Sequence, residues 1–232
     1  MGTSIASSIF VLPATITSRM QINSDLEGVN DVILSAIVGS QLHVETVLES
    51  RLSLQSWDCK YFLDQYAFSS MQPGGVYTLE IPSNFIRKDS AFTITVGSTW
   101  QMNDAVVIPN TDYSVNYDRG MVYIAANSGS SLYSVSNGYP SSYDNRYIEI
   151  KCTTGFKSGD PNDLDTTPPE VIPDWLQEAI IAYVGVIFDT SQTTNRDNQA
   201  SAIYKKSGDH AMAILSPYLR KRGFVFRPIA IL

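Results

Sequence analysis

Hydrophobic residues along this chain follow a helical spacing first, an alternating spacing in the middle, and a helical spacing again toward the C-terminus. The first stretch begins at Val29 and repeats apolar residues every three or four positions, which predicts an amphipathic helix. Its apolar members are Val29, Val32, Ile33, Ala36, Ile37, Val44, Val47, Leu48 and Leu52. Gly39, within this run, indicates either a point of close packing or a bend. Residues 1–28 are rich in serine and threonine and are expected to form an extended arm.

Apolar and polar residues alternate from residue 57 to residue 156, which predicts antiparallel β-strands. The alternating positions are Tyr77, Leu79 and Ile81; Phe92, Ile94 and Val96; Tyr113, Val115 and Tyr117; and Ile148, Ile150 and Cys152. The sequence Asp118-Arg119-Gly120 predicts a β-hairpin turn, because glycine tolerates a positive φ.

Residues 127–146 are rich in serine, tyrosine, glycine and asparagine and are expected to form an exposed loop. Tyr133, Tyr139 and Tyr143 are candidate contact residues there, since tyrosine is enriched in binding loops. A hairpin tip without a binding role is the alternative.

Helical spacing returns at Pro173, a residue suited to the first position of a helix. Residues 175–188 are apolar on nearly all sides, which predicts burial on several faces. Asp209 is expected to cap a further helix from His210 to Leu215, and Pro217 is expected to end it.

Together these patterns predict the α+β class, in which a helical core of one N-terminal helix and the C-terminal helices carries a large antiparallel β insertion. The expected parts are an arm at 1–28, a helical core domain at 29–56 and 173–219, a β-rich insertion at 57–156, a linker at 157–172 and a C-terminal extension at 220–232.

Charge is divided unevenly along the chain. The formal net charge of −7 argues against a general nucleic-acid binder, which needs clustered cations. Residues 200–232 nevertheless hold six basic side chains and one acidic one, whereas the preceding residues are strongly acidic. This division favours a basic C-terminus that meets an acidic partner, and a solvated C-terminus is the alternative.

Cysteine use and the N-terminus indicate a soluble protein made in a reducing cytoplasm. Cys59 and Cys152 are the only cysteines and are expected to be free buried thiols. Pro13 interrupts the short apolar run near the N-terminus, so no signal peptide is expected. No apolar stretch of transmembrane length is expected either.

Candidate chemistry is sparse. His43 and His210 are the only histidines, and no phosphate loop or nucleophile motif occurs. The run from Asp160 to Asp165 resembles a calcium loop, but Leu164 stands where that pattern needs a ligand and Asp165 where it needs glycine. We therefore expect no catalytic residues, no bound metal, no cofactor and no enzymatic activity.

Four segments in order carry a resemblance to a known family. They are a helix running from Val32 to Leu52, a β insertion from Trp57 to Phe156, the sequence Ile172-Pro173-Asp174-Trp175-Leu176-Gln177, and the sequence Ala213-Ile214-Leu215-Ser216-Pro217-Tyr218-Leu219-Arg220. This order and spacing, over about residues 29–222, resembles the head–tail connector (adaptor, or head-completion) family of tailed bacteriophages. The β insertion and the N-terminal arm are both longer here than in compact members.

The resemblance implies a structural virion protein of the neck, made in the host bacterial cytoplasm. It implies a homo-oligomeric ring, usually a dodecamer, that docks under the portal protein, extends the DNA channel and offers a platform to the next neck or tail protein. Double-stranded DNA would pass through without specific binding, since an acidic ring repels phosphates. No membrane partner is implied.

Two sets of site residues follow from this resemblance. The ring wall would be built on the core helix through Trp175, Leu176, Ile180, Tyr183 and Ile187. The C-terminal segment would reach the portal through Arg220, Lys221, Arg222, Phe224, Phe226, Arg227 and Ile229, whose alternation also suits an extended peptide at a sheet edge. The competing interpretations are another virion module, such as a tail-terminator, a stopper or a β-rich host-glycan-binding protein, and an enzyme.

Overall fold

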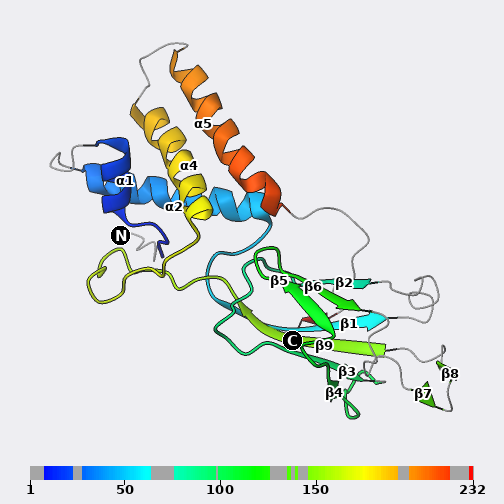
Figure 1. Cartoon of the computed structure of the whole chain (residues 1–232). Coiled ribbons are helices and arrows are strands. Elements are labelled where there is room, and N and C mark those ends of the chain that lie inside the picture. Colours follow the sequence, from blue (N-terminus) through cyan, green and yellow to red (C-terminus); the bar gives the residue numbers. More distant parts are fainter. Residues whose placement is uncertain are drawn as a thin grey trace. The chain divides into compact units, whose positions relative to one another are not determined.

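The chain forms two compact units, and the helices and the sheets are divided between them (Figure 1). Unit 1 comprises Met1–Leu54 and Phe156–Arg220, and unit 2 comprises Gln55–Gly155 and Lys221–Leu232. The structure is a computed structural model that describes residues 8–22, 28–63, 76–97, 99–125, 135–136, 139–140, 146–192, 199–219 and 230–231. The expected α+β class is confirmed.

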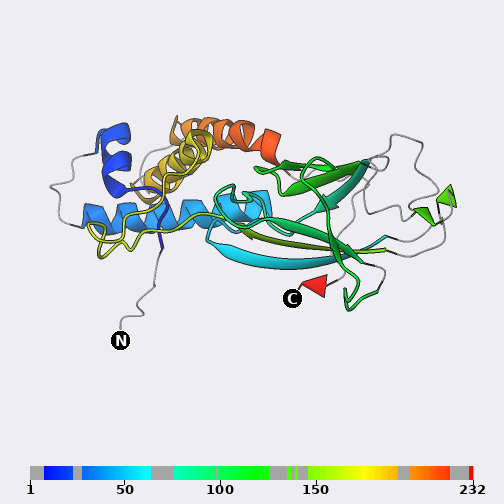
Figure 2. The same ribbon diagram turned by 60° about the horizontal axis from the view of Figure 1, so that its bottom comes forward.

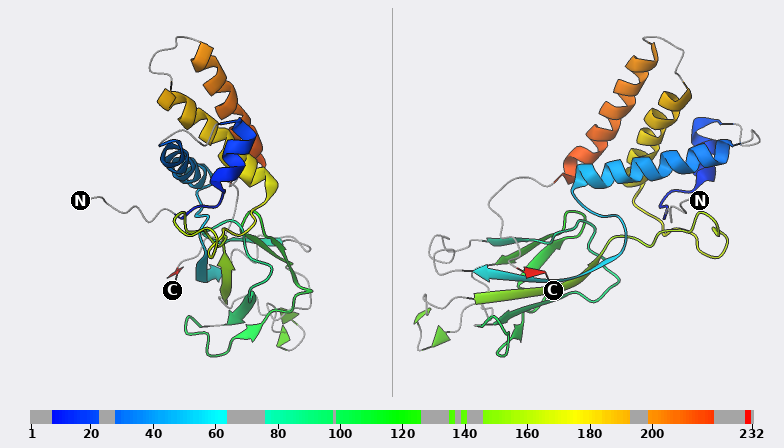
Figure 3. Two further views of the ribbon diagram at one scale, coloured as in Figure 1. Left: turned by 90° about the vertical axis from the view of Figure 1, so that its left-hand side faces the viewer. Right: turned by 180° about the vertical axis from the view of Figure 1, so that it is seen from behind.

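Helices make up the regular structure of unit 1. They are α1 (Pro13–Met20), α2 (Val29–Leu48), α4 (Asp174–Gln192), α5 (Gln199–Leu215) and the short 3₁₀ helix η1 (Ser216–Tyr218). Figure 3 shows α4 and α5 side by side, with α2 crossing α4.

Helix α2 confirms the helical period read from Val29. Its buried face contains Ile33, Ala36, Ile37, Val44 and Leu48. A Cβ on Gly39 would lie 3.2 Å from Cδ1 of Ile187 in α4, so this glycine marks close packing between the two helices. Ser40 is buried, and its hydroxyl donates to the Ala36 carbonyl at 2.7 Å, which keeps its polar atom satisfied inside the helix pair.

The expected extended arm is wrong for part of residues 1–28, because Pro13–Met20 form α1 and Ile9, Phe10, Val11 and Ile16 are buried. Serine and threonine have modest helix propensity, and contacts from distant residues stabilise this segment instead. The buried Gln41 side chain accepts from the Phe10 amide at 2.8 Å and donates to the Ser8 carbonyl at 3.1 Å. Ile9 and Gly159 exchange two backbone hydrogen bonds, at 3.1 and 2.7 Å.

Residues 157–172 contain no helix or strand, yet they are more than a solvated linker. Besides the pairing of Gly159 with Ile9, Glu170 donates its amide to the Lys157 carbonyl at 2.9 Å and accepts from the Lys157 amide at 2.9 Å. A Cβ on Gly159 would lie 2.6 Å from Cδ of Pro169. These contacts hold the segment as a closed loop within unit 1.

The two C-terminal helices depart from the sequence expectation at their starts. Helix α4 begins at Asp174, and Pro173 precedes it, with its carbonyl accepting from the amides of Leu176 and Gln177 at 2.9 and 3.0 Å. Helix α5 begins at Gln199, so Asp209 lies inside it and caps nothing. The alanine- and lysine-containing run before Asp209 favours helix and outweighs Gly208. Pro217 ends the α-helix as expected.

Unit 2 consists of antiparallel sheets. Its strands are β1 (Gln55–Leu63), β2 (Val76–Glu80), β3 (Thr93–Gly97), β4 (Val106–Val107), β5 (Tyr113–Asn116), β6 (Met121–Ala125), β7 (Val135–Ser136), β8 (Tyr139–Pro140), β9 (Arg146–Thr154) and β10 (Ala230–Ile231). One sheet has the order β10-β1-β9-β3-β4, a second has the order β2-β6-β5, and β7 pairs with β8. The larger two are seen as separate layers in Figure 2.

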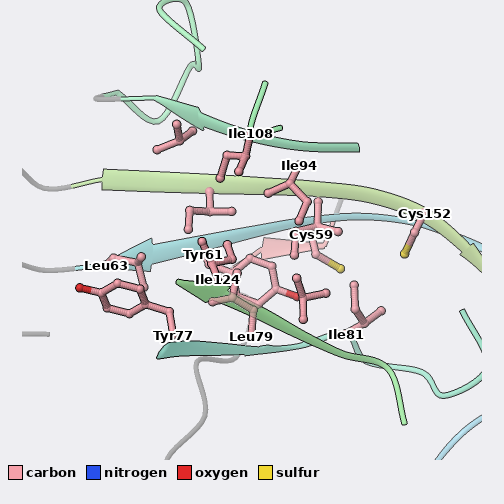
Figure 4. Packing of buried hydrophobic residues seen from close by; sticks show 14 of the residues in the cluster. Cys59, Tyr61, Leu63, Tyr77, Leu79, Ile81, Ile94, Ile108, Ile124 and Cys152 are labelled. Carbon is pink, nitrogen blue, oxygen red and sulfur yellow. The ribbon is translucent and has the colours of Figure 1, made fainter. Parts of the chain in front are cut away.

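The core of unit 2 lies between the two larger sheets and confirms the alternating pattern (Figure 4). Its fully buried side chains include Tyr61, Tyr77, Leu79, Ile94 and Ile124. The Tyr61 hydroxyl donates to the Glu80 carbonyl at 2.9 Å, which satisfies a polar group inside the core. Burial raises the pKa of this hydroxyl well above its usual value.

Both thiols are free and buried, as the sequence predicts. Cys152 is directly opposite Trp57, and Cys59 is directly opposite Ile150, so the two cysteines are diagonal neighbours on adjacent strands. Diagonal Cα atoms are about 7–8 Å apart, beyond the usual reach of a disulfide. Burial raises the pKa of Cys59 to about 11 and that of Cys152 to about 12, so both stay protonated near neutral pH.

The predicted hairpin is confirmed as β5 and β6, and Gly120 at its turn has φ +64°. A Cβ on Gly120 would lie 2.0 Å from the backbone oxygen of Ser83, so the turn packs directly on the segment that follows β2. The Gly120 carbonyl also accepts from the Ile81 amide at 2.8 Å. This glycine is therefore required both for backbone conformation and for space.

Replacing Gly120 with alanine should destabilise unit 2 by about 2–4 kcal/mol, because the methyl group collides with backbone and the residue has positive φ. Urea unfolding followed by circular dichroism measures this change. Gly208→Ala is the control: Gly208 lies within α5 with no atom near its Cβ position, so alanine should stabilise by about 0.5–1 kcal/mol. Equal stability of Gly120→Ala and the parent protein would contradict the packing described here.

Candidate interaction surfaces

The two ends of the helical signature meet in an aromatic stack. Trp175, at the start of α4, lies flat on Tyr218 of η1, with ring centroids 3.6 Å apart and an interplanar angle of 5°. Both side chains are half-buried. Helix α5 ends at Leu215, and the following 3₁₀ turn, which contains Pro217, carries the Tyr218 ring that lies against the tryptophan. The stack thus joins the start of α4 to the short helix that follows α5.

The other expected ring-wall residues divide into two groups. Three of them, Leu176, Ile180 and Tyr183, are buried within unit 1. The Tyr183 ring contacts the exposed His43 ring edge-on, with ring centroids 4.3 Å apart. Ile187 is half-buried against Gly39. The expected burial of α4 on several sides is therefore wrong for part of its surface, since Ile181, Ala182 and Val186 stay half-exposed.

A partly exposed apolar stripe runs along α2. Leu34 and Val38 are half-buried, and Leu42 is 53% exposed, at successive intervals of four residues. By length and composition alone α2 is long and apolar enough to cross a membrane, contrary to the sequence expectation. Core helices of soluble proteins share these properties, and the opposite face of α2 is buried within unit 1.

The outer face of the five-stranded sheet carries an ionic cluster that sequence reasoning missed. Lys60 lies 3.6 Å from Glu149, and Lys151 lies 3.2 Å from both Glu149 and Asp58. Hydrogen bonds to Glu149 and Asp58 raise the pKa of Lys151. The strand register explains the cluster, because it places Asp58 opposite Lys151 and Lys60 opposite Glu149. This pairing depends on register, which no local motif reveals.

Aromatic rings border the ionic cluster. The Lys60 ammonium is nearly buried, donates to the Trp100 carbonyl at 3.0 Å and lies 5.0 Å from the Trp100 ring. The Tyr147 ring contacts the Trp100 ring edge-on, with ring centroids 5.8 Å apart, and its centroid lies 5.2 Å from that of Phe62. The positive charges are matched by carboxylates, so the face is held together internally.

Most of the expected partner-binding residues lie outside the described parts of the chain. These are Arg220, Lys221, Arg222, Phe224, Phe226, Arg227 and Ile229 of the C-terminal segment, and Tyr133 and Tyr143 of the expected loop. Tyr139 lies in β8, which pairs with β7. Beyond the basic segment, Ala230 and Ile231 pair antiparallel with Lys60 and Cys59 of β1.

Candidate metal ligands do not converge within the described ranges, where no group of three or more histidine, cysteine or acidic side chains could hold a metal ion. In the run from Asp160 to Asp165, the Asp160 carboxylate accepts from the Asn162 amide at 2.9 Å, and the Asp163 carboxylate accepts from the Thr166 hydroxyl. These carboxylates stabilise local turns.

Comparisons with known proteins give only distant structural likenesses. No family model matches the chain, and no curated protein matches it. The chain is similar to a chain in the neck of an empty gene transfer agent particle, computed with C6 symmetry, with 13% identity, a TM-score of 0.44 and coverage of 93% of this chain and 92% of that chain. It is also similar to a chain in the virion of a native gene transfer agent particle, with 14% identity, a TM-score of 0.42 and the same coverages. At these values neither likeness assigns a function.

The Trp175–Tyr218 stack should contribute a measurable pairwise free energy. Single and double alanine variants at these positions should give a coupling of about 0.5–1.5 kcal/mol in a double-mutant cycle of urea unfolding. Tyr218→Phe is the control, since it keeps the ring and should retain most of the coupling. Additive effects of the two alanine substitutions would show that the stacked rings do not stabilise each other.

Proposed function

We propose that this protein is a structural head–tail connector, an adaptor that forms a homo-oligomeric ring under the portal and extends the DNA channel. The observation that carries the proposal is the apolar stripe of α2, because unit 1 leaves it partly uncovered. A second copy of the same chain is the occupant that a ring supplies. Head-to-tail contacts of this kind close into rings when the rotation between copies permits.

The meeting of Trp175 with Tyr218 supports the same proposal. The two sequence segments on which the resemblance to connectors depends lie far apart in the chain, and their aromatic rings stack directly. If the resemblance to connectors had arisen by chance, these two residues would have no reason to contact each other. In the proposed ring, α4 and α5 act together as part of the wall.

The distribution of charge supports the proposed partners. An acidic body suits a channel through which DNA moves without being bound, since like charges repel. The basic residues after Leu219 suit contact with an acidic surface of the portal. A downstream neck or tail protein would dock on the same ring, and the particle neck would be its location.

Substitution on the apolar stripe tests ring formation. The purified protein should form closed rings in size-exclusion chromatography with light scattering and in electron micrographs. Leu42→Glu should weaken assembly about 10-fold or more, because it buries a charge in the contact, while the exposed position allows folding. Val171→Glu is the control, since Val171 is 89% exposed and outside the stripe. A protein that stays monomeric at high concentration and with portal present would refute the ring.

Removal of the C-terminal segment tests portal docking. A chain that ends at Leu219 should lose binding to purified portal, measured by co-sedimentation. A full-length variant with Arg220, Lys221 and Arg222 replaced by alanine should bind more weakly, and its binding should depend less on salt than that of the parent protein, since its charge contacts are gone. Full binding by the truncated chain would place the portal contact elsewhere.

A further inference from the structure

Among the residues that the structure describes, strand β1 is only partly paired on its outer side. Along its inner side all nine residues pair with β9, from Gln55 opposite Thr154 to Leu63 opposite Arg146. On its outer side, among the described residues, β10 pairs with two residues, Cys59 and Lys60. Within the described part of the chain β10 is thus the edge strand of this sheet, and the nine-residue pairing of β1 with β9 does not depend on it.

The described residue that precedes β10 in the chain belongs to the helical unit and not to the sheet. Leu219 is the last described residue of unit 1, and the next described residue, Ala230, is already paired in unit 2. Eleven residue steps separate Leu219 from Ala230, so the connection can span up to about 36–40 Å. A strand joined in this way can be supplied by any copy whose unit 1 lies within that span.

We infer that β10 is exchanged between copies in the assembled ring, so that the Ala230–Ile231 strand of one copy pairs with Cys59 and Lys60 of its neighbour. This inference rests on the proposed ring. Its occupant is a second copy of this chain, because the exchanged strand makes the same pairs as the strand it replaces and no new contact has to be evolved.

Ring closure suits such an exchange. Each copy donates one β10 strand and accepts one, so a closed ring leaves neither an empty edge nor an unused strand. The acceptor positions are well supported: Cys59 is fully buried, and the Lys60 side chain is fixed by Glu149 and the Trp100 carbonyl. Because these acceptor residues are already held in place, β1 needs little ordering when the β10 strand of another copy pairs with it.

A disulfide between two register partners tests the exchange in the full-length chain. Ile231→Cys places a thiol opposite the native Cys59, and Cys152→Ala removes the other thiol. The variant is assembled, checked for rings by native mass spectrometry, oxidised with copper phenanthroline and run on a non-reducing denaturing gel. Exchange predicts covalent multimers up to the ring size, in which mass spectrometry finds the peptide containing Cys59 disulfide-bonded to the C-terminal peptide. The same variant with Cys59→Ala is the control and should stay monomeric on the gel.

The outcomes separate this inference from the proposed ring. Rings whose subunits carry this disulfide only within one chain, or carry none, would overturn the exchange and leave the ring intact. Absence of rings in the native protein would overturn both. Deletion of residues 230–232 gives an independent readout, since exchange predicts that its rings dissociate at about 10-fold higher protein concentration than the parent rings. Unchanged ring dissociation would count against a strand shared between copies.

Discussion

The nine-residue pairing between β1 and β9 is the interaction on which the rest of the structure depends. These strands are the first and the last of the β region that interrupts unit 1, so their pairing brings its entry and exit together. Just outside them, the Phe156 amide donates to the Leu52 carbonyl at 2.8 Å, and Ser53 and Phe156 form an isolated parallel β-bridge. Because the two ends of the β region lie together, inserting it costs unit 1 little more conformational entropy than closing one short loop.

The segment from Ile81 to Arg87 extends this constraint to the second sheet. Its backbone bonds to the hairpin turn through Ile81 and Ile86, and to the end of β9 through Arg87, whose amide donates to the Thr153 carbonyl at 2.8 Å. Phe85 adopts a positive φ of 60° within it, and its carbonyl accepts from the Gly155 amide at 2.9 Å. One irregular segment thus ties the two larger sheets together, and this explains why Gly120 must approach Ser83 so closely.

Local patterns in the sequence predicted most of the elements and few of the contacts between them. The spacing from Val29 predicted α2, and the alternation predicted the strands that enclose Tyr61 and Ile94, because periodicity directly reflects one-sided burial. Helix α1 and the first half of α5 were missed, since distant partners such as Gln41 stabilise the former and no strong cap marks the latter. The ionic cluster around Lys60 was missed because it exists only in the register of β1 with β9. Trp175 was expected in the ring wall and Tyr218 belongs to the C-terminal signature, but no local pattern indicated that their rings stack.

The C-terminal end of the described chain depends on the same strand. Ala230 and Ile231 pair with Lys60 and Cys59 of β1, so these last described residues belong to unit 2, whereas Leu219 belongs to unit 1. The chain therefore passes between the two units once more after Leu219, and the strand that opens the β region also receives the C-terminal strand. Because β1 is held by its nine pairs with β9, that pairing also sets where β10 lies within unit 2.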